Sequence, residues 1–242
     1  MLDLQEVTGG YAPGQEVIRK IAFSVREREI TGMVGLNGAG KSTIIKHILG
    51  LLEPISGEIR VQGKTLTDDP LFYRGQMAYI PETPKLYEEL TLWEHLELTA
   101  MVYQVEKTAL HERAAQLLEL FRLTERVDDF PTEFSKGMQQ KVMILCALLV
   151  QPPLLIVDEP FVGLDPLAIQ SLLELFEEMK RQGTALLLST HILGTAEKYC
   201  DRFVMIHQGE VALRGTLPEM REQAQMPGAT LDEMFVSVVR GQ

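Results

Sequence analysis

One short segment limits the possible folds of this chain more than any other. Gly35-Leu36-Asn37-Gly38-Ala39-Gly40-Lys41-Ser42-Thr43 matches the pattern G-x-x-x-x-G-K-[ST] at every fixed position. An apolar run at residues 30–34 precedes the segment, and residues 42–52 carry isoleucine and leucine at helical spacing. A strand that leads into a glycine-rich loop and then a helix is the context in which this pattern binds phosphate. The sequence therefore predicts a phosphate-binding loop.

The residue types of this loop have separate physical roles. The glycines let the backbone wrap closely and turn its N–H groups inward, and the following helix points its positive end at the phosphates. Lys41 adds a positive charge for the β- and γ-phosphates, and the Ser42 hydroxyl suits Mg²⁺, which prefers oxygen. Kinases, GTPases and ATPases share such a loop, so it does not identify a reaction. The residues expected to contact the nucleotide are Gly35, Asn37, Gly38, Ala39, Gly40, Lys41, Ser42 and Thr43.

A second candidate site is a pair of carboxylates after a buried strand. Residues 154–157 are Leu-Leu-Ile-Val, and Asp158-Glu159 follow. A carboxylate in this position can hold Mg²⁺, and Glu159 can orient or deprotonate an attacking water molecule. Two acids beside a bound phosphate would repel it without a cation, so the pair indicates Mg²⁺. Taken alone, the pair is equally typical of a solvated acidic turn before Pro160.

Composition narrows the class of protein. The chain has 242 residues and a net charge of -11, so we expect no general attraction for nucleic acid or for an anionic membrane surface. Its two cysteines suit a reducing cytosol, and no His/Cys cluster has metal-binding spacing. From the first residues we expect no signal peptide, and the uncharged residues 142–157 are interrupted by Pro152-Pro153. We therefore expect no membrane-spanning helix.

Strand and helix patterns alternate along the chain. The expected strands lie at residues 2–7, 18–25, 30–34, 59–61, 77–80, 154–157 and 185–189, with a hairpin at 203–206 and 210–213. The expected helices lie at residues 42–52, 91–121, 135–150, 166–181 and 230–239. Buried strands alternating with helices predict an α/β core with a mainly parallel sheet. The helical residues 84–151 would form a subdomain inserted between two halves of that sheet.

With these two sites in place, the chain resembles the ATP-binding cassette of ABC transporters over nearly its whole length. The resemblance implies a P-loop NTPase (RecA-like) core with an N-terminal antiparallel β portion and an inserted α-helical subdomain. It implies one cassette over residues 1–242, with the core at 1–83 and 152–218, the helical subdomain at 84–151 and a C-terminal helical tail at 219–242. It also implies ATP hydrolysis with Mg²⁺, a homodimer of cassettes formed on ATP binding, and a separate transmembrane permease subunit. The cassette would be cytoplasmic, on the inner face of the membrane, and the direction of transport would be export.

Shorter motifs carry this resemblance in the family order. Tyr11 lies where the family has an aromatic residue that stacks on adenine, although a tyrosine that covers the core would fit as well. Residues 135–140 lie where the family's signature motif opens a helix, so Ser135 and Gly137 are expected to face the γ-phosphate held by a second cassette. Asp165 matches the loop that contacts the opposite cassette, and His191 matches the switch histidine that contacts the γ-phosphate. Ser135 and Asp165 are equally good helix N-caps, and a single histidine is often structural.

Three positions depart from the family pattern. The signature reads Phe134-Ser135-Lys136-Gly137-Met138 where Leu-Ser-Gly-Gly-Gln is common, which adds a positive charge and removes the hydrogen bonds of glutamine. Glu82 replaces a glutamine that lies near Mg²⁺ and the membrane partner, and its carboxylate still offers oxygen to the ion. These changes concern turnover and coupling more than nucleotide binding. The stretch Tyr-Ile-Pro-Glu-Thr-Pro and the altered signature look like the Ecs-type bacterial ATPase subunit.

Other classes fit the sequence less well. Soluble ABC ATPases of DNA repair or translation typically carry two cassettes, a long coiled coil or zinc modules, and GTPases carry an Asn-Lys-x-Asp motif; this sequence has none of these. A nucleotide-dependent binding module with negligible turnover stays open because of the altered signature and Glu82. The permease would dock between Glu82 and the helix at Thr91, where Tyr87, Trp93 and Tyr103 either line the groove or pack the core.

Overall fold

The computed structural model of the chain describes residues 1–12 and 14–241. The strands are β1 (Leu2–Gly9), β2 (Ile18–Val25), β3 (Ile30–Val34), β4 (Ser56–Val61), β5 (Met77–Ile80), β6 (Leu154–Asp158), β7 (Ala185–Thr190), β8 (Arg202–His207) and β9 (Glu210–Gly215). The α-helices are α1 (Lys41–Ile48), α2 (Pro70–Gly75), α3 (Leu92–Val102), α4 (Lys107–Leu120), α5 (Lys136–Val150), α6 (Pro166–Gln182), α7 (Leu193–Tyr199), α8 (Leu217–Gln223) and α9 (Leu231–Arg240). Two 3-10 turns, η1 (Thr124–Arg126) and η2 (Pro131–Glu133), lie before α5.

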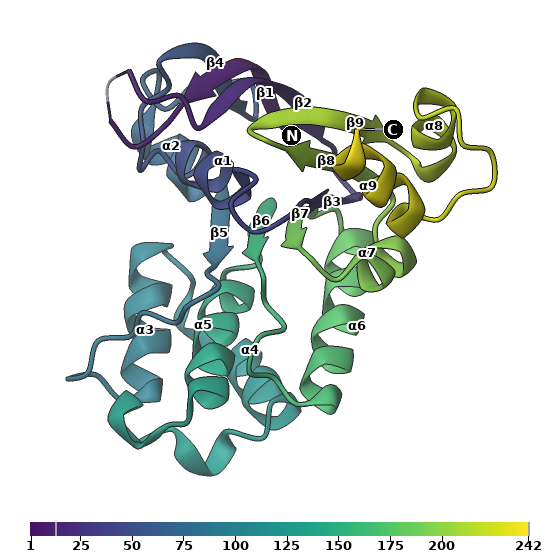
Figure 1. Cartoon of the computed structure of the whole chain (residues 1–242). Helices are drawn as coiled ribbons and strands as arrows, with labels where there is room; N and C mark the ends of the chain where they lie inside the picture. The colour runs from purple at the N-terminus through teal and green to yellow at the C-terminus, as the bar shows by residue number, and fades with distance from the viewer. Residues whose placement is uncertain (13, 242) are drawn as a thin grey trace.

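The strands form two sheets (Figure 1). The larger sheet has the order β5-β6-β7-β3-β8-β9, in which every pair is parallel except β8 with β9. The smaller sheet, β2-β1-β4, is antiparallel throughout. The predicted α/β class, with a mainly parallel sheet and an N-terminal antiparallel portion, is therefore confirmed.

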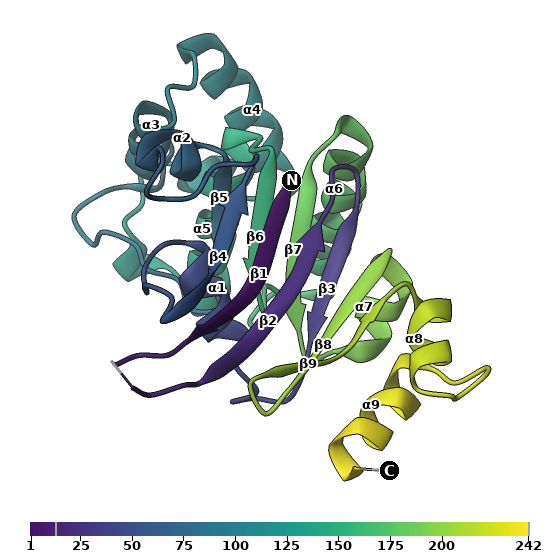
Figure 2. The ribbon, with the colours of Figure 1, turned by 90° about the horizontal axis from the view of Figure 1, so that it is seen from above.

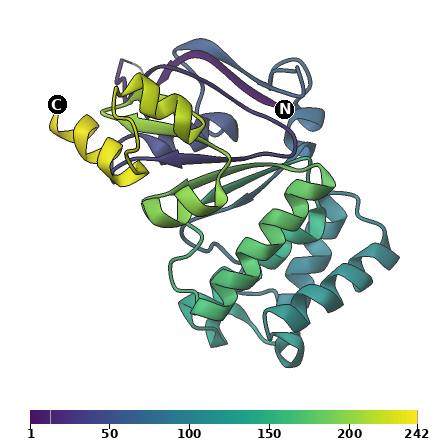
Figure 3. The same ribbon diagram turned by 90° about the vertical axis from the view of Figure 1, so that its right-hand side faces the viewer.

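The larger sheet is buried on both faces, which explains the uninterrupted apolar runs in its strands. In β6, Leu154 and Ile156 pack with the smaller sheet and α1, whereas Leu155 and Val157 pack with α3, α4, α5 and α6. Figure 3 shows these four helices on one side of the sheet and the smaller sheet on the other. Because side chains alternate along β6, this one strand contributes to two hydrophobic cores.

Helix α1 lies between the two sheets and sets the position of the glycine-rich loop. Ile44, Ile45 and Ile48 are fully buried against strands of both sheets. Viewed from above, the smaller sheet crosses the larger one (Figure 2). The loop is therefore held between the carboxyl end of β3 and a helix that the core immobilises.

The region between β5 and β6 is helical, as predicted, but not continuously so over residues 91–121. Helix α3 ends at Val102 and α4 begins at Lys107, with Gln104 in a left-handed conformation (φ 55°) between them. The reversal lets both helices pack against α5 in the core that also covers one face of the larger sheet. The boundaries proposed for a core, a subdomain and a tail stay predictions; Gln242, the last residue of that tail, lies outside the described residues.

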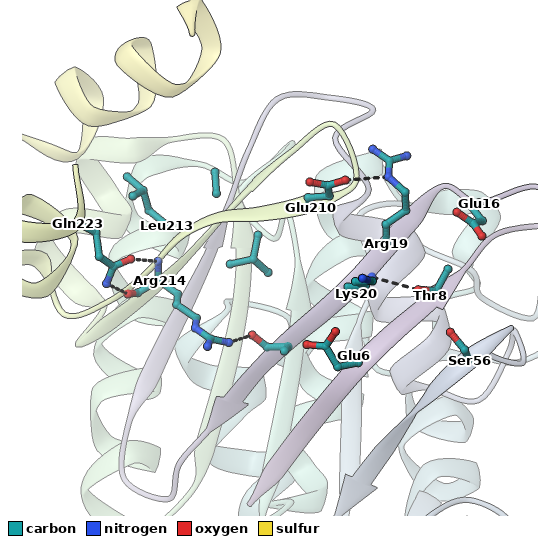
Figure 4. A pocket seen from close by; sticks show the side chains of 13 residues that line it. Glu6, Thr8, Glu16, Arg19, Lys20, Ser56, Glu210, Leu213, Arg214 and Gln223 are labelled. Carbon is teal, nitrogen blue, oxygen red and sulfur yellow. Dashed lines mark hydrogen bonds and ion pairs between the residues drawn. The ribbon is translucent and has the colours of Figure 1, made fainter. Parts of the chain in front are cut away.

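A seam joins the two sheets where the edges of β2 and β9 approach each other (Figure 4). The Arg19 backbone N–H donates to Gly209 O at 2.7 Å, and the Arg214 guanidinium donates to Ala22 O across the seam. The Gln223 side-chain amide bonds to both the N–H and the carbonyl of Arg214. These contacts give part of the edge of β9, at Arg214, hydrogen-bond partners within the chain. The cavity in this view is lined in part by Arg19, which pairs with Glu210, and by Arg214, which bonds to the backbone of β2.

Three short helices, α2, α7 and α8, were not predicted as separate elements. Each has six or seven residues, which is too few for a periodic pattern to be recognised. Start signals were nevertheless present for α2 and α8: Asp69 and Thr216 cap them, and proline occupies an early helical position in both. Throughout the described part of the chain, every helix is too short or too polar to cross a bilayer.

Candidate nucleotide-binding site

The glycine-rich loop begins where β3 ends, and its shape requires glycine at two positions. Gly40 has φ 113°, and a Cβ atom there would also lie 2.9 Å from Ile18 Cγ2. A Cβ atom on Gly35 would lie 2.5 Å from Ile206 O. Any side chain at either position would push the loop away from β2 or β8. The packing of the sheets therefore fixes the path of this loop.

Lys41, the first residue of α1, lies beneath the loop. Its side chain is 6% exposed, and its amine donates to Gly35 O at 2.9 Å and to Leu36 O at 3.3 Å. The same amine lies 3.7 Å from Glu159 Oε1. A buried cation held by loop carbonyls can exchange them for phosphate oxygens, which carry full negative charge.

Along the part of the chain that the structure describes, three buried oxygens without a hydrogen-bond partner lie at the carboxyl ends of β6 and β7. They are Asp158 Oδ1, Glu159 Oε1 and Ser189 Oγ, and none has a hydrogen-bond partner among the described residues. Asp158 pairs with Ser189 across the strands, and Glu159 N donates to Ser189 O. Buried oxygens are normally hydrogen-bonded, so this edge is arranged to receive a ligand. Ser189 was not predicted as a site residue from the sequence. The signal that could have identified it is its position as a polar residue at the end of the apolar run 185–188.

Glu159 has a strained backbone and is held by two neighbours. Its φ of 46° places a non-glycine residue in the left-handed region, a conformation that is concentrated at functional sites. Its Oε2 lies 2.8 Å from His191 Nδ1 and accepts a hydrogen bond from the His191 backbone N–H at 3.3 Å. The carboxylate therefore lies between the amine of Lys41 and the imidazole of His191.

These groups surround one cavity of about 460 Å³. Glu82 is exposed and lines the cavity from the loop after β5. Burial raises the pKa of Tyr79, and the negative charges of Asp158 and Glu82 add to the rise. The residues that line the cavity are Tyr11, Val17, Leu36, Asn37, Gly38, Gly40, Lys41, Ser42, Thr43, Glu82, Glu159 and His191.

The donor set fits Mg²⁺ only together with a phosphate ligand. Within residues 1–12 and 14–241, no group of three or more His, Cys, Asp or Glu side chains is placed to hold a metal by itself. Mg²⁺ usually takes one or two carboxylates and completes its shell with water and substrate phosphates. Asp158 has an unpartnered oxygen, and Ser42 and Glu82 line the cavity, so these side chains fit that mode of binding.

Tyr11 lies at the edge of the cavity. Its hydroxyl accepts a hydrogen bond from Thr43 Oγ1 at 3.1 Å, and Lys46 Nζ lies 4.8 Å from the centre of its ring. The residue is 54% exposed, so part of the ring remains open to a flat ligand. Stacking on adenine stays a prediction. The contact of Lys46 with this ring was not predicted from the sequence.

Ser135, Gly137 and Asp165 do not line this cavity. Ser135 caps α5 and accepts from Met138 N at 3.3 Å, and Asp165 caps α6 and accepts from Ala168 N at 2.9 Å. The Ala168 N–H and then Lys141 hold the pKa of Asp165 below its usual value. The N-cap alternative is therefore confirmed for both residues, and any contact with nucleotide would have to involve another molecule.

The three aromatic residues named for a docking groove have different environments. Tyr103 is partly buried and its hydroxyl donates to Met77 O at 3.0 Å, so it anchors α3 to β5. Trp93 is half-buried against the core, and its ring lies 5.2 Å from that of His111. Tyr87 is 62% exposed, so it alone of the three presents most of its surface to solvent.

The fold and the cavity define a nucleotide-binding protein of the phosphate-loop class. In comparisons with known proteins, the model of the ABC transporter family matches residues 18–162. The chain therefore belongs to the ABC transporter family. It is an ATP-binding subunit and an ATPase, as predicted.

Individual relatives agree with this assignment. The chain is 53% identical over 240 residues to the ABC-type transporter ATP-binding protein EcsA of Bacillus subtilis (strain 168), covering 99% of this chain and 97% of that protein. A solved ATP-binding subunit of an ABC transporter is 54% identical, with a TM-score of 0.96 and 99% of each chain covered. The dimeric post-hydrolysis state of the cassette MJ0796, bound to ADP and Pi, is 25% identical, with a TM-score of 0.81, and the match covers 90% of this chain and 99% of that one. The resemblance to the Ecs type is thereby confirmed.

Proposed function

We propose that two copies of this chain close head to tail around two ATP molecules and, by hydrolysing them, drive a separate transmembrane subunit. One observation carries the proposal: the Glu159 carboxylate lies 3.7 Å from the Lys41 amine and 2.8 Å from the His191 imidazole, beside a phosphate-loop cavity. The Glu159 carboxylate, a candidate base for water, is thus in contact with both a cation suited to phosphate and a histidine.

The loop and its lysine bind the triphosphate. Lys41 exchanges the carbonyls of Gly35 and Leu36 for β- and γ-phosphate oxygens, and the backbone N–H groups of the loop hold the remaining charge. Ser42, Asp158 and Glu82 would hold Mg²⁺, and the ion would supply positive charge to offset the negative charge of the phosphates. Tyr11 stacks on the adenine ring.

Glu159 then acts as the general base. It accepts a proton from the water molecule that attacks the γ-phosphate, while the His191 side chain contacts the transferred phosphate. The contact between His191 and Glu159 supports this assignment, because it already orients the carboxylate within the cavity.

The second copy supplies the remaining contacts. Ser135 and Gly137, at the start of α5, and Asp165, at the start of α6, lie outside this chain's own cavity. Each of these residues is therefore free to contact a nucleotide bound in the cavity of the second copy. Because the γ-phosphate would bridge the two copies, ATP favours the closed dimer and its cleavage allows the dimer to reopen.

The transmembrane subunit docks beside Glu82 and α3, where Tyr87 is exposed. This docking places the chain on the cytoplasmic, inner face of the membrane. We propose export as the direction, as the resemblance to ABC transporters indicates. Gentle detergent extraction followed by affinity purification of the chain should recover one polytopic membrane protein; recovery of nucleic acid or soluble proteins alone would contradict this part.

Steady-state ATP hydrolysis by the purified chain tests the catalytic part. Wild type is expected to hydrolyse ATP only when Mg²⁺ is present, and Glu159→Gln is expected to lose roughly 10²- to 10⁴-fold in kcat because the base is removed. A wild-type chain that binds ATP without turnover would instead be a nucleotide-dependent binding module.

A further inference from the structure

Gln140 is a buried polar residue that contacts the loop carrying Glu82. It lies on α5, is 1% exposed, and follows the five-residue signature by two positions. Its side-chain Nε2 donates to Pro81 O at 3.0 Å. Pro81 connects the end of β5 to Glu82, so one hydrogen bond joins the signature helix to this loop.

The same face of α5 also contacts the loop that follows Glu159. Gly137, Gln140 and Lys141 are three and four positions apart, so they lie on one side of the helix. A Cβ atom on Gly137 would lie 2.2 Å from the carbonyl oxygen of Gly163, and Lys141 Nζ lies 3.0 Å from Asp165 Oδ2. One face of α5 therefore contacts the loops that carry both Glu82 and Glu159.

The second polar atom of the Gln140 amide is unsatisfied. Its Oε1 is buried and has no hydrogen-bond partner in the described part of the chain. A buried amide whose oxygen has no hydrogen-bond partner stabilises a fold less than an apolar side chain of similar size does. The hydrogen bond to Pro81 is thus better explained by the position it gives the loop than by the stability it contributes.

We infer that Gln140 is a positioning residue that fixes the Glu82 loop to the signature helix. When a nucleotide held by a second copy engages the start of α5, the displacement of α5 moves Pro81 and hence Glu82. Occupancy of one site thereby sets the position of a carboxylate in the other. This inference rests on the proposed function, since it concerns how the two sites of the dimer communicate.

Gln140→Met tests the inference, because methionine nearly preserves volume and removes the donor. Loss of one such hydrogen bond is expected to lower kcat by about five- to tenfold. Affinity for ATP, measured by calorimetry, should change less than about twofold because Gln140 does not line the cavity. Hydrogen–deuterium exchange of the nucleotide-free chain should be faster in the peptide covering residues 81–90.

Gln139→Met is the matched control. Gln139 lies on the same helix, and its Nε2 donates to Pro131 O at 2.9 Å, so the bond has the same chemistry but leads to η2 instead of the Glu82 loop. This variant is expected to keep wild-type exchange at residues 81–90. If Gln140→Met is poorly folded, Gln140→Asn, which is too short to reach Pro81 O, replaces it with the same expected results.

Two outcomes overturn the inference. Wild-type kcat and exchange in the Gln140 variant would show that the bond has no positioning role, and equal losses in both variants would show a general weakening of α5. Failure of the proposed function would give a different result, because wild type itself would then hydrolyse no ATP. The exchange measurement needs no nucleotide and still tests the link between Gln140 and the loop.

Discussion

The imidazole of His191 and the carboxylate of Glu159 are in direct contact, with Nδ1 and Oε2 2.8 Å apart. The two residues follow neighbouring parallel strands, β7 and β6, whose carboxyl ends meet at the same edge of the sheet. The His191 side chain is 51% exposed, whereas that of Glu159 is 8% exposed. The histidine therefore connects a buried base to the open side of the cavity.

Replacing His191 with alanine should lower turnover more than ATP affinity. The variant removes a side chain that orients Glu159 and that we assign to the transferred phosphate, so we expect kcat to fall about 100-fold or more. Steady-state kinetics together with calorimetric binding separates the two quantities. His111→Ala, at an exposed position on α4, is the control. Wild-type kcat in His191→Ala would refute the assigned role.

Lys41→Ala should weaken nucleotide binding. Charge-assisted hydrogen bonds are worth about 1.5–3 kcal/mol, so the loss corresponds to roughly a 10- to 100-fold weaker affinity for ATP. Isothermal titration calorimetry measures it directly, and the melting temperature of the variant shows whether the loop remains folded. Unchanged affinity would remove this amine from the binding site.

Gly137→Ala should destabilise the chain even without nucleotide, because a Cβ atom there would lie 2.2 Å from Gly163 O. Overpacking of this kind costs about 1–3 kcal/mol, and each kcal/mol lowers Tm by about 2–4 °C in a chain of this size. Gly194→Ala is the control, since a Cβ atom at that helical position meets nothing within 4 Å. Its Tm should be unchanged or higher. Equal Tm values for Gly137→Ala and wild type would show that α5 and the Gly163 loop are not in close contact.

His47 should make stability depend on pH. Its Nδ1 donates to Leu52 O at 3.0 Å, and its buried Nε2 has no partner among residues 1–12 and 14–241. Burial lowers the pKa of His47 more than the bond to Leu52 raises it. The unfolded chain therefore takes up a proton below about pH 6.5 that the folded chain resists, so the free energy of unfolding decreases as pH falls through this region.

Thermal melts at pH 7.5 and 5.5 check this prediction. The Tm difference between the two pH values should be smaller for His47→Gln, which cannot take up a proton at this position, than for wild type. An equal difference in both proteins would mean that His47 does not contribute to the acid sensitivity.

The parts of the fold that were predicted depend on local features of the sequence. Fully apolar runs such as residues 154–157 are typical of strands buried on two faces, and the structure buries β6 on both sides. The glycine-rich loop was predictable because its pattern depends on backbone geometry that few sequences allow. The break between α3 and α4 was not, because Gln104 has no strong local preference for the left-handed conformation it adopts.

Contacts between distant segments could not be read from the sequence. The contacts of Glu159 with Lys41 and His191 depend on three strands whose order in the sheet differs from their order in the chain. The contact of Gln140 with Pro81 likewise needs the packing of α5 against β5. The sequence predicts which side chains have suitable chemistry, whereas tertiary packing decides which of them meet.

The central claim is that a nucleotide held by Lys41 and Glu159 must be enclosed by a second copy of the chain. Light scattering of Glu159→Gln after size exclusion, with and without ATP, tests it most directly. Because this variant binds ATP but cannot cleave it, the account predicts that ATP doubles the mass from the 27.2 kDa of one chain. A mass that stays at one chain while calorimetry shows bound ATP would contradict the account.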